Sequence, residues 1–149
     1  LRREWITASL PPDHPFALYC RRFGYRDETR YARNAGPMGR VIDSTRFFTA
    51  LAPELASRWP ADALEKLTVR SVDGAVTLVR KEGTVDLQQG TRGGVSISDP
   101  ALLMQLAMGY RDADDAISAG TLTGTRPQLA LTRALFPLRV AHMSWPDRF

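Results

Sequence analysis

Few side chains in this sequence of 149 residues are of the types that carry out nucleophilic or metal-assisted chemistry. The chain has one cysteine, Cys20, and two histidines, His14 and His142, which lie far apart with no ligand spacing around either. One cysteine excludes an internal disulfide and a cysteine-rich metal site, so we expect no metal. We expect Cys20 to be a small core residue rather than a nucleophile paired with a histidine.

Three other stretches have compositions that could serve a site. The acidic group at 111–115 could supply paired carboxylates, but aspartates at a helix start are usually caps and dipole partners. The turns "RNAGPM" at 33–38 and "GTRGG" at 90–94 contain glycines, as phosphate-binding loops do. Such a loop needs a helix N-terminus after it. Because a strand is expected after each, we interpret both as turns.

Composition and charge indicate which classes of protein this sequence can belong to. The apolar fraction is 44% and the charged fraction is 24%, which is typical of one soluble globular domain. The net charge of +4 is dispersed, so we expect no nucleic-acid partner. No apolar run reaches the roughly 20 residues that a membrane span needs, and we expect a cytoplasmic protein. The first residue is Leu1, from which we expect a processed or truncated N-terminus.

The N-terminal part predicts a strand, a helix and a second strand. Residues 3–10 could form the first strand. Residues 14–23 follow as a short helix, and Gly24 fits the position after a helix end where a left-handed conformation is needed. Residues 25–33 alternate enough to form a strand, and the turn residues that follow predict a domain boundary near residue 35.

The next segment predicts a strand and a long helix. Residues 40–43 read as a short strand, after which Asp43 or Ser44 can cap a helix. Pro53 inside this helix predicts a kink or a restart. A buried helix face is predicted by the spacing of Phe47, Phe48, Leu51, Leu55 and Trp59.

A group of strands follows. We predict strands at 64–72, 75–81, 84–89 and 95–98. Asp73–Gly74 and Glu82–Gly83 separate the first three, and such pairs favour two-residue hairpins of type I′. The predicted arrangement is an antiparallel meander.

Helices close the sequence. Their predicted ranges are 98–110, 112–120 and 125–136. Residues expected on their buried faces are Leu102, Leu103, Leu106, Tyr110, Leu129, Leu135 and Phe136. The first of these helices could line a ligand tunnel, although its spacing is that of any core helix. Pro137 ends the last helix. Strands grouped before helices predict an α+β fold, an antiparallel sheet with helices packed on one face.

Four stretches together resemble a known family: "MGRVIDSTRFFTAL", "VDGAVTL", "GGVSISDPALLMQLAMGYRDADDAISAG" and "LFPLRVAHMSWPDRF". They resemble the C-terminal sterol-carrier-like domain of multidomain GNAT N-acetyltransferases of the enhanced-intracellular-survival type. The helix–glycine–strand pattern before them resembles the end of the preceding acetyltransferase domain. The resemblance implies two domains, a remnant of the acetyltransferase domain at 1–35 and a sterol-carrier-like domain with a C-terminal tail at 36–149.

The resemblance also implies a site. The α-carboxylate of Phe149 would be the general base, and a tyrosine the general acid. Cys20 stands where the family has that tyrosine, which leaves Tyr19, one position earlier. Trp145 and Asp147 would contact the substrate. The implied cofactor is acetyl-CoA, bound mainly by residues outside this chain.

Three functions remain open at this point. The chain could be the C-terminal part of an N-acetyltransferase for a small-molecule or peptide amine, inactive alone, with the rest of that enzyme and further copies as partners. It could be a sterol-carrier-like module that binds lipid or fatty acyl ligands in an apolar tunnel. It could also be an interaction domain that organises an oligomer.

Overall fold

The computed structural model describes residues 7–8, 10, 14–26, 28, 39–90 and 93–139. The chain separates into two compact units, one at 38–139 and one that combines 1–37 with 140–149. Each unit is described by itself below. The assignment of 1–35 and 36–149 to two domain families stays a prediction.

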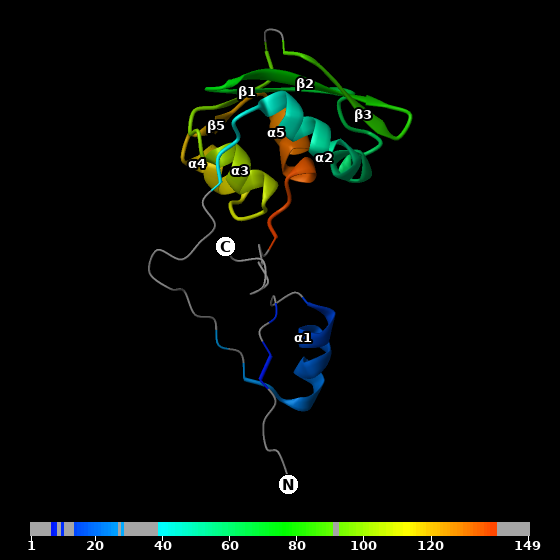
Figure 1. Ribbon diagram of the computed structural model, residues 1–149, viewed down its shortest axis with the longest axis vertical. Helices are drawn as coiled ribbons and strands as arrows, with labels where there is room; N and C mark the ends of the chain where they lie inside the picture. Colours follow the sequence, from blue (N-terminus) through cyan, green and yellow to red (C-terminus); the bar gives the residue numbers. More distant parts are fainter. Residues whose placement is uncertain are drawn as a thin grey trace. The chain divides into compact units, whose positions relative to one another are not determined.

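The 38–139 unit is an α+β structure, as predicted, built on a five-stranded sheet. Its strands are β1 (Lys66–Ser71), β2 (Gly74–Lys81), β3 (Thr84–Gln89), β4 (Val95–Ile97) and β5 (Leu122–Thr123), in the spatial order β3-β2-β1-β4-β5. Its helices are α2 (Ser44–Arg58), α3 (Leu102–Ala107), α4 (Ala113–Ser118) and α5 (Arg126–Leu135). All four helices lie on one face of the sheet (Figure 1).

The two hairpins of the sheet differ in their turns. Between β2 and β3, Glu82 and Gly83 have φ of 44° and 82°, which confirms the predicted type I′ turn. Between β1 and β2 the loop is Val72–Asp73, because Ser71 pairs with Gly74. The predicted Asp73–Gly74 turn is therefore wrong by one residue. Gly74 instead begins β2 with a φ of 136°, a value that favours glycine.

The fourth strand does not continue the meander. β4 pairs in parallel with β1, on the side away from β2, so the sheet is antiparallel only within β1–β3 and between β4 and β5. One row across the sheet holds Gln89, Val76, Val69 and Val95. The chain therefore moves sideways by three strand spacings, about 14 Å, between β3 and β4.

Two glycines lie close to neighbouring strands, one after β3 and one before β4. A Cβ at Gly90 would collide with the backbone of Ala75, and a Cβ at Gly94 would collide with the carbonyl oxygen of Thr68. Ala75 and Thr68 alternate with the buried Val76 and Val69, so they face away from the helices. Gly90 continues the pairing of β3 with β2, because its N–H donates to the carbonyl oxygen of Ala75 at 2.9 Å, and Gly94 lies next to Thr68 just before β4 begins.

The core begins with α2. Asp43 caps this helix, as predicted, by accepting a hydrogen bond from the backbone N–H of Arg46 at 3.0 Å. Residues 40–43 do not form the predicted strand, because they pair with no described strand and lead directly into the helix. Pro53 lies inside α2, and the helix continues through it without a restart. Side chains of the predicted helix face that are buried are Phe48, Leu55 and Trp59, while Phe47 and Leu51 are partly buried.

The helices after the sheet complete one hydrophobic cluster. Leu102, Leu103 and Leu106 of α3 are buried in it, which confirms this helix as a core element. Tyr110 is 73% exposed, contrary to the prediction. The helix ends at Ala107, and Gly109 with a φ of 67° turns the chain before Tyr110. Of the α5 residues predicted as buried, Leu135 and the following Phe136 are buried and Leu129 is partly buried.

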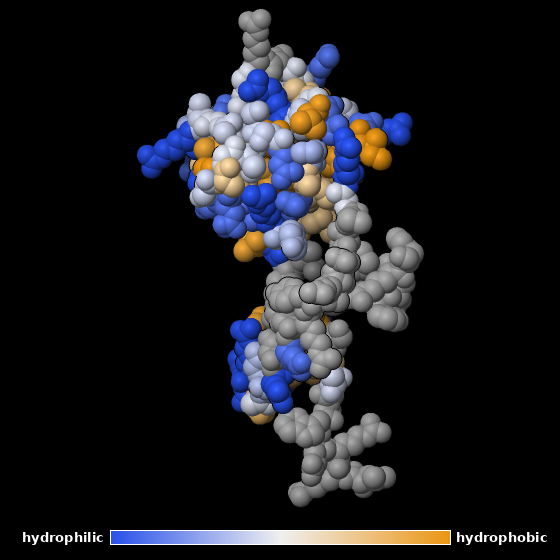
Figure 2. Space-filling model, turned by 90° about the vertical axis from the view of Figure 1, so that its left-hand side faces the viewer, coloured by the Kyte–Doolittle hydropathy of each residue, from blue (hydrophilic) through white to orange (hydrophobic). Residues whose placement is uncertain are grey.

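Apolar side chains that reach the surface of this unit are scattered on the face shown in Figure 2. The large exposed ones are Ile42, Leu64, Val72, Met108, Tyr110 and Leu138. Met108, Tyr110 and Leu138 come from two segments that meet where the N–H of Arg139 donates to the carbonyl oxygen of Gly109, and the other three come from separate loops.

The N-terminal unit contains the predicted helix. It consists of α1 (Pro15–Cys20) and a 3₁₀ turn, η1 (Arg21–Phe23), followed by Gly24 with a φ of 71°. The predicted strands on either side are not found where the structure describes the chain. Thr7, Ala8 and Leu10 belong to no helix or strand, and neither do Tyr25, Arg26 and Glu28. The other residues of 3–10 and 25–33 lie outside the described ranges.

Candidate functional site

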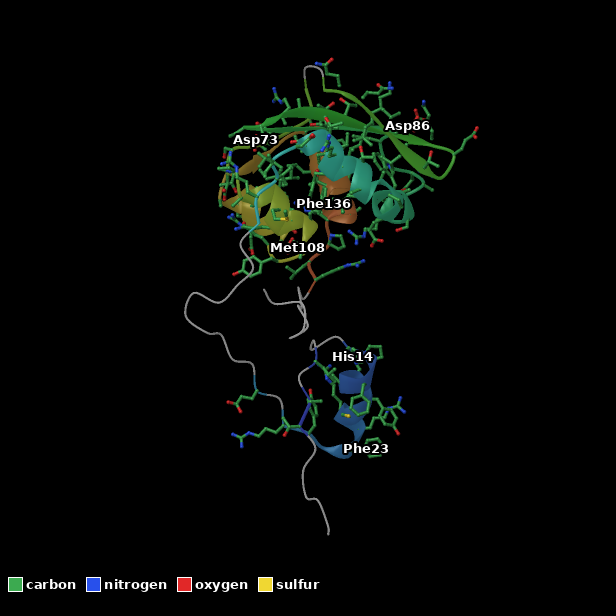
Figure 3. All side chains as sticks on the ribbon, viewed as in Figure 1. His14, Phe23, Asp73, Asp86, Met108 and Phe136 are labelled. Carbon is green, nitrogen blue, oxygen red and sulfur yellow. The ribbon has the colours of Figure 1, made fainter. Side chains whose placement is uncertain are left out.

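The predicted general acid, Tyr19, belongs to an exposed aromatic stripe on α1 and η1. Phe16, Tyr19 and Phe23 recur at helical spacing and are 50%, 54% and 70% exposed. The rings of Tyr19 and Phe23 contact each other with their centroids 5.2 Å apart. Neither α1 nor η1 has a buried residue. His14 and Phe23 mark the two ends of this segment in Figure 3.

The side of the helix next to this stripe is more covered. His14, Ala17 and Cys20, three residues apart, are partly buried. Cys20 is thus only partly buried, and within the described residues it does not belong to a core as predicted, since no side chain of α1 is buried there. His14 accepts a hydrogen bond from the N–H of Phe16 at 3.1 Å through Nδ1. That nitrogen caps the helix, a structural role.

A second phenol lies just beyond the helix. Tyr25 is 44% exposed, and its hydroxyl oxygen accepts a hydrogen bond from Nε of Arg21 at 3.0 Å. This contact joins the turn at Gly24 to the last turn of the helix. Tyr19, in contrast, contacts its neighbours in this segment through its ring.

The other predicted site residues lie outside the described ranges. These are Phe149, Trp145 and Asp147, together with His142 and the turn at 33–38. Their roles stay predictions.

The remaining stretches singled out from composition are structural where they are described. The stretch at 90–94 is followed by the strand β4 and not by a helix, as expected, while residues 91 and 92 lie outside the described ranges. In the acidic group, Asp112 caps α4 by accepting from the N–H of Asp114 at 3.1 Å. Asp114 in turn accepts from Nε of Arg133 at 2.6 Å. These carboxylates serve helix ends, as expected.

No group of three or more His, Cys, Asp or Glu side chains suited to a metal ion occurs within the described ranges. Likewise, none of the helices in those ranges is both long and apolar enough to cross a membrane.

A surface groove of about 780 Å³ opens where α2 begins. It is lined by three segments, residues 42–45 at the start of α2, 73–76 at the start of β2, and 87–89 at the end of β3. Asp73, labelled in Figure 3, lies on its rim and pairs with Arg40 at 3.2 Å. The three segments are distant in sequence, so no local pattern could have predicted the groove.

The two carboxylates that line the groove pair with arginines outside its lining. Asp43 caps the helix and lies 3.5 Å from Arg46, and Asp73 pairs with Arg40. Ser44, which also lines the groove, is buried and its hydroxyl has no hydrogen-bond partner.

Replacing Ser44 with alanine is expected to leave the free energy of unfolding unchanged or to raise it by up to about 1 kcal/mol. A buried hydroxyl without a partner carries an uncompensated desolvation cost, which alanine removes. Urea unfolding of both proteins tests this. A loss of more than about 1 kcal/mol would show that the hydroxyl makes a hydrogen bond that matters. Thr132→Val is the control with the opposite expected result, a lower free energy of unfolding, because the Thr132 hydroxyl donates a hydrogen bond to the carbonyl of Gln128 at 2.8 Å.

Comparisons with known proteins find similarity only to solved structures, and only over about half of this chain. No model of a known protein family matches the sequence, and no curated protein matches it. Among solved structures, the chain is similar over 52% of its length to a GCN5-related N-acetyltransferase from Anabaena variabilis ATCC 29413, with 19% identity and a TM-score of 0.43. It is similar over 55% of its length to a conserved Enterococcus faecalis V583 protein of unknown function, described as a probable N-acyltransferase, with 22% identity and a TM-score of 0.39. The chain covers 21% and 22% of those two chains.

Proposed function

We propose that this chain is the C-terminal part of an acetyl-CoA-dependent N-acetyltransferase that acts on a small-molecule or peptide amine. The observation that carries the proposal is the exposed aromatic stripe of Phe16, Tyr19 and Phe23 on a helix with no buried side chain. Isolated helices shorter than about 12–15 residues are marginal in water, so this one needs a surface to cover it. The resemblance of 14–24 to the end of an acetyltransferase domain supports the proposal that this surface is the rest of such a domain.

The two units have different roles in this proposal. The 38–139 unit has its own continuous core and acts as a scaffold. The segment at 14–26 completes the catalytic domain, whose acetyl-CoA site lies in residues outside this chain. The partners are the rest of the parent enzyme and further copies of it in an oligomer.

The proposed chemistry is acetyl transfer between a thioester and an amine. The α-carboxylate of Phe149 accepts a proton as the amine nitrogen attacks the thioester carbonyl. The carbon–sulfur bond then breaks, and the phenol of Tyr19 donates a proton to the leaving thiolate. Trp145 and Asp147 contact the amine substrate. The exposure of Tyr19 leaves its hydroxyl accessible to a group supplied by the parent enzyme.

The experiment compares two proteins, the 149-residue chain and the longer natural enzyme, in an assay of thiol release from acetyl-CoA with a panel of amines. We expect no turnover by the chain alone, because it lacks the cofactor site, and turnover by the longer enzyme. Deleting Phe149 from the longer enzyme leaves the α-carboxylate on Arg148, one residue short of its proposed position, and should lower kcat by up to about 10²–10⁴-fold, the usual contribution of general acid–base catalysis. Turnover by the 149-residue chain would overturn the proposal.

A further inference from the structure

One edge of the five-stranded sheet has no neighbouring strand in the part of the chain that the structure describes. β3 stands first in the strand order, where it pairs with β2 on one side and with no described strand on the other (Figure 1). Such an edge presents unpaired N–H and C=O groups that another strand can bind. The opposite edge of the sheet is β5, whose two residues offer a much shorter pairing surface.

The hydrogen bonds of β3 show which of its backbone groups point outward. The N–H of Gly90 donates to the carbonyl oxygen of Ala75 at 2.9 Å, so these two residues form a hydrogen-bonded pair that continues the register of β2 and β3. Hydrogen-bonded and non-hydrogen-bonded pairs alternate along an antiparallel ladder. The N–H and C=O groups of Val85, Leu87 and Gln89 therefore point away from β2, toward the free edge.

β3 has none of the usual features that protect such an edge. Edge strands are commonly blocked by proline, by lysine, by a bulge or by very short length. β3 has six residues, contains neither proline nor lysine, and keeps an unbroken register with β2. Its one charged side chain, Asp86 (labelled in Figure 3), pairs with Lys81 of β2 at 2.8 Å. The edge is therefore able to accept a further strand.

We propose that β3 pairs in antiparallel orientation with β3 of a second copy of this chain. A symmetric pair uses the same surface on both copies, and outward residues must face outward residues, so the two-fold axis passes through one residue of β3. With Leu87 on the axis, Leu87 faces its counterpart and Val85 faces Gln89 of the other copy. All three outward residues are then paired. The inference goes beyond the proposed function, which names further copies as partners but no surface for them, and it does not depend on acetyl transfer.

The side chains favour this register over its two neighbours. An axis through Asp86 would place two carboxylates directly opposite each other, which is destabilising. An axis through Gln88 would leave one of the three outward residues without an outward residue of β3 opposite it. With the axis at Leu87, Asp86 of each copy lies opposite Gln88 of the other, with the two Cβ atoms about 5 Å apart. The amide of Gln88 can donate to the carboxylate of Asp86 at this separation.

The proposed pairing also covers apolar surface. Leu87 packs against the core but is only partly buried. It lines the groove at the start of α2 together with Ile42, which is 90% exposed. Two Leu87 side chains that face each other across the axis bury surface that a single copy leaves in contact with water, which favours association.

The first test measures self-association of the 149-residue chain by sedimentation equilibrium, in the wild type, Gln89→Pro and the matched control Gln89→Ala. The side chain of Gln89 is exposed and its N–H points outward, so proline removes a donor that β2 does not use. We expect a dimer in the wild type and in Gln89→Ala. The dimer Kd of Gln89→Pro should be raised by about tenfold or more, because symmetry removes two hydrogen bonds.

Two outcomes of this first test would overturn the inference. One is a wild-type chain that stays monomeric at every concentration. The other is the same dimer Kd in all three proteins, which would place the association elsewhere, for example at the exposed stripe on α1. The urea unfolding transition of each variant at a concentration where the chain is monomeric shows that proline has not disrupted the fold itself.

The second test exchanges the two side chains that face each other. Gln88→Asp puts a carboxylate opposite Asp86 of the other copy and should raise the dimer Kd about tenfold. Adding Asp86→Gln to the same chain restores one amide opposite one carboxylate and should return the Kd to within a few-fold of the wild type. The exposed ion pair of Asp86 with Lys81 contributes little to stability, so the double variant keeps its fold. A double variant that dimerises no more tightly than Gln88→Asp would contradict the register.

Hydrogen exchange then locates the interface in the wild type. The amide of Leu87 should exchange rapidly in the dilute monomer and slowly in the dimer, whereas the amide of Gln88, which faces β2, should be protected in both. Exchange at Leu87 that does not change with concentration would overturn the inference. None of these tests measures turnover, so their failure leaves the proposed acetyl transfer intact, and failure of the acetyl transfer leaves the pairing of β3 intact.

Discussion

Replacing Gly94 with alanine is expected to destabilise the 38–139 unit by about 3 kcal/mol or more, among the larger effects that single substitutions have. Gly94 has a φ of 91°, and a Cβ there would collide with the carbonyl oxygen of Thr68 and lie 2.6 Å from the Cβ of Thr68. Both atoms belong to β1, in the middle of the sheet. Neither the strand nor the entry to β4 can move without breaking the pairing of β1 with β4.

The matched control is the neighbouring residue. Gly93 has a φ of 92°, and a Cβ there would meet nothing within 4 Å. Gly93→Ala therefore has the same backbone strain without the collision and should cost about 1 kcal/mol. Urea unfolding of the full chain, followed by circular dichroism, measures both. Equal losses of unfolding free energy for Gly93→Ala and Gly94→Ala would mean that Gly94 does not lie in close contact with β1.

Phe48→Ala has the second large expected effect, a loss of about 3–5 kcal/mol. The side chain of Phe48 is fully buried between α2 and the sheet, and it belongs to the cluster that joins all four helices of this unit. Truncation removes buried apolar surface and leaves a cavity that the surrounding helices and strands can only partly fill.

Phe47 provides the comparison for this second prediction. It is the same residue type on the same helix, its ring contacts that of Phe48 with centroids 5.5 Å apart, and it is only partly buried. Phe47→Ala should cost about 1–2 kcal/mol, since solvent already reaches part of the ring and can fill the vacated space. A larger loss for Phe47→Ala than for Phe48→Ala would contradict the packing described here. The same unfolding experiment measures both variants.

The sequence predicted those parts of the fold that local chemistry decides. Glu82–Gly83 forms the expected turn because both residues take positive φ and six residues on each side pair in antiparallel register. Asp43 caps α2 because a carboxylate before an apolar helix face has the N–H groups of the first turn within reach. The α+β class follows from the order of such elements.

The sequence did not predict features that depend on contacts between distant segments. The spacing around 90–94 indicates a turn, but it contains no information that β4 would pair with β1 rather than continue next to β3. The two-residue β5 is too short to have a periodicity. Tyr110 fits the apolar spacing of α3, yet the helix ends at Ala107, before it.

In the candidate site, too, local features could be predicted from the sequence and contacts between distant residues could not. The helix at 14–23 and its closing Gly24 could be predicted, and with them the position of Tyr19 on a helix. The exposure of Phe16 and Phe23 could not be predicted. Apolar spacing on a helix indicates a face that is covered by something, but it does not show whether the covering residues belong to the same chain. The contact between Gly109 and Arg139 joins residues thirty positions apart and leaves no trace in local spacing.

The central claim is that these 149 residues work as one end of a larger acetyltransferase, and the intact mass of the natural protein tests it most directly. The protein can be captured from its source cells with an antibody raised against the 38–139 unit. The account predicts a mass that exceeds that of 149 residues by at least one further domain, roughly 100–200 residues. A mass equal to that of the 149 residues would contradict it, because no other part of the chain would then exist to cover the stripe of Phe16, Tyr19 and Phe23 or to bind acetyl-CoA.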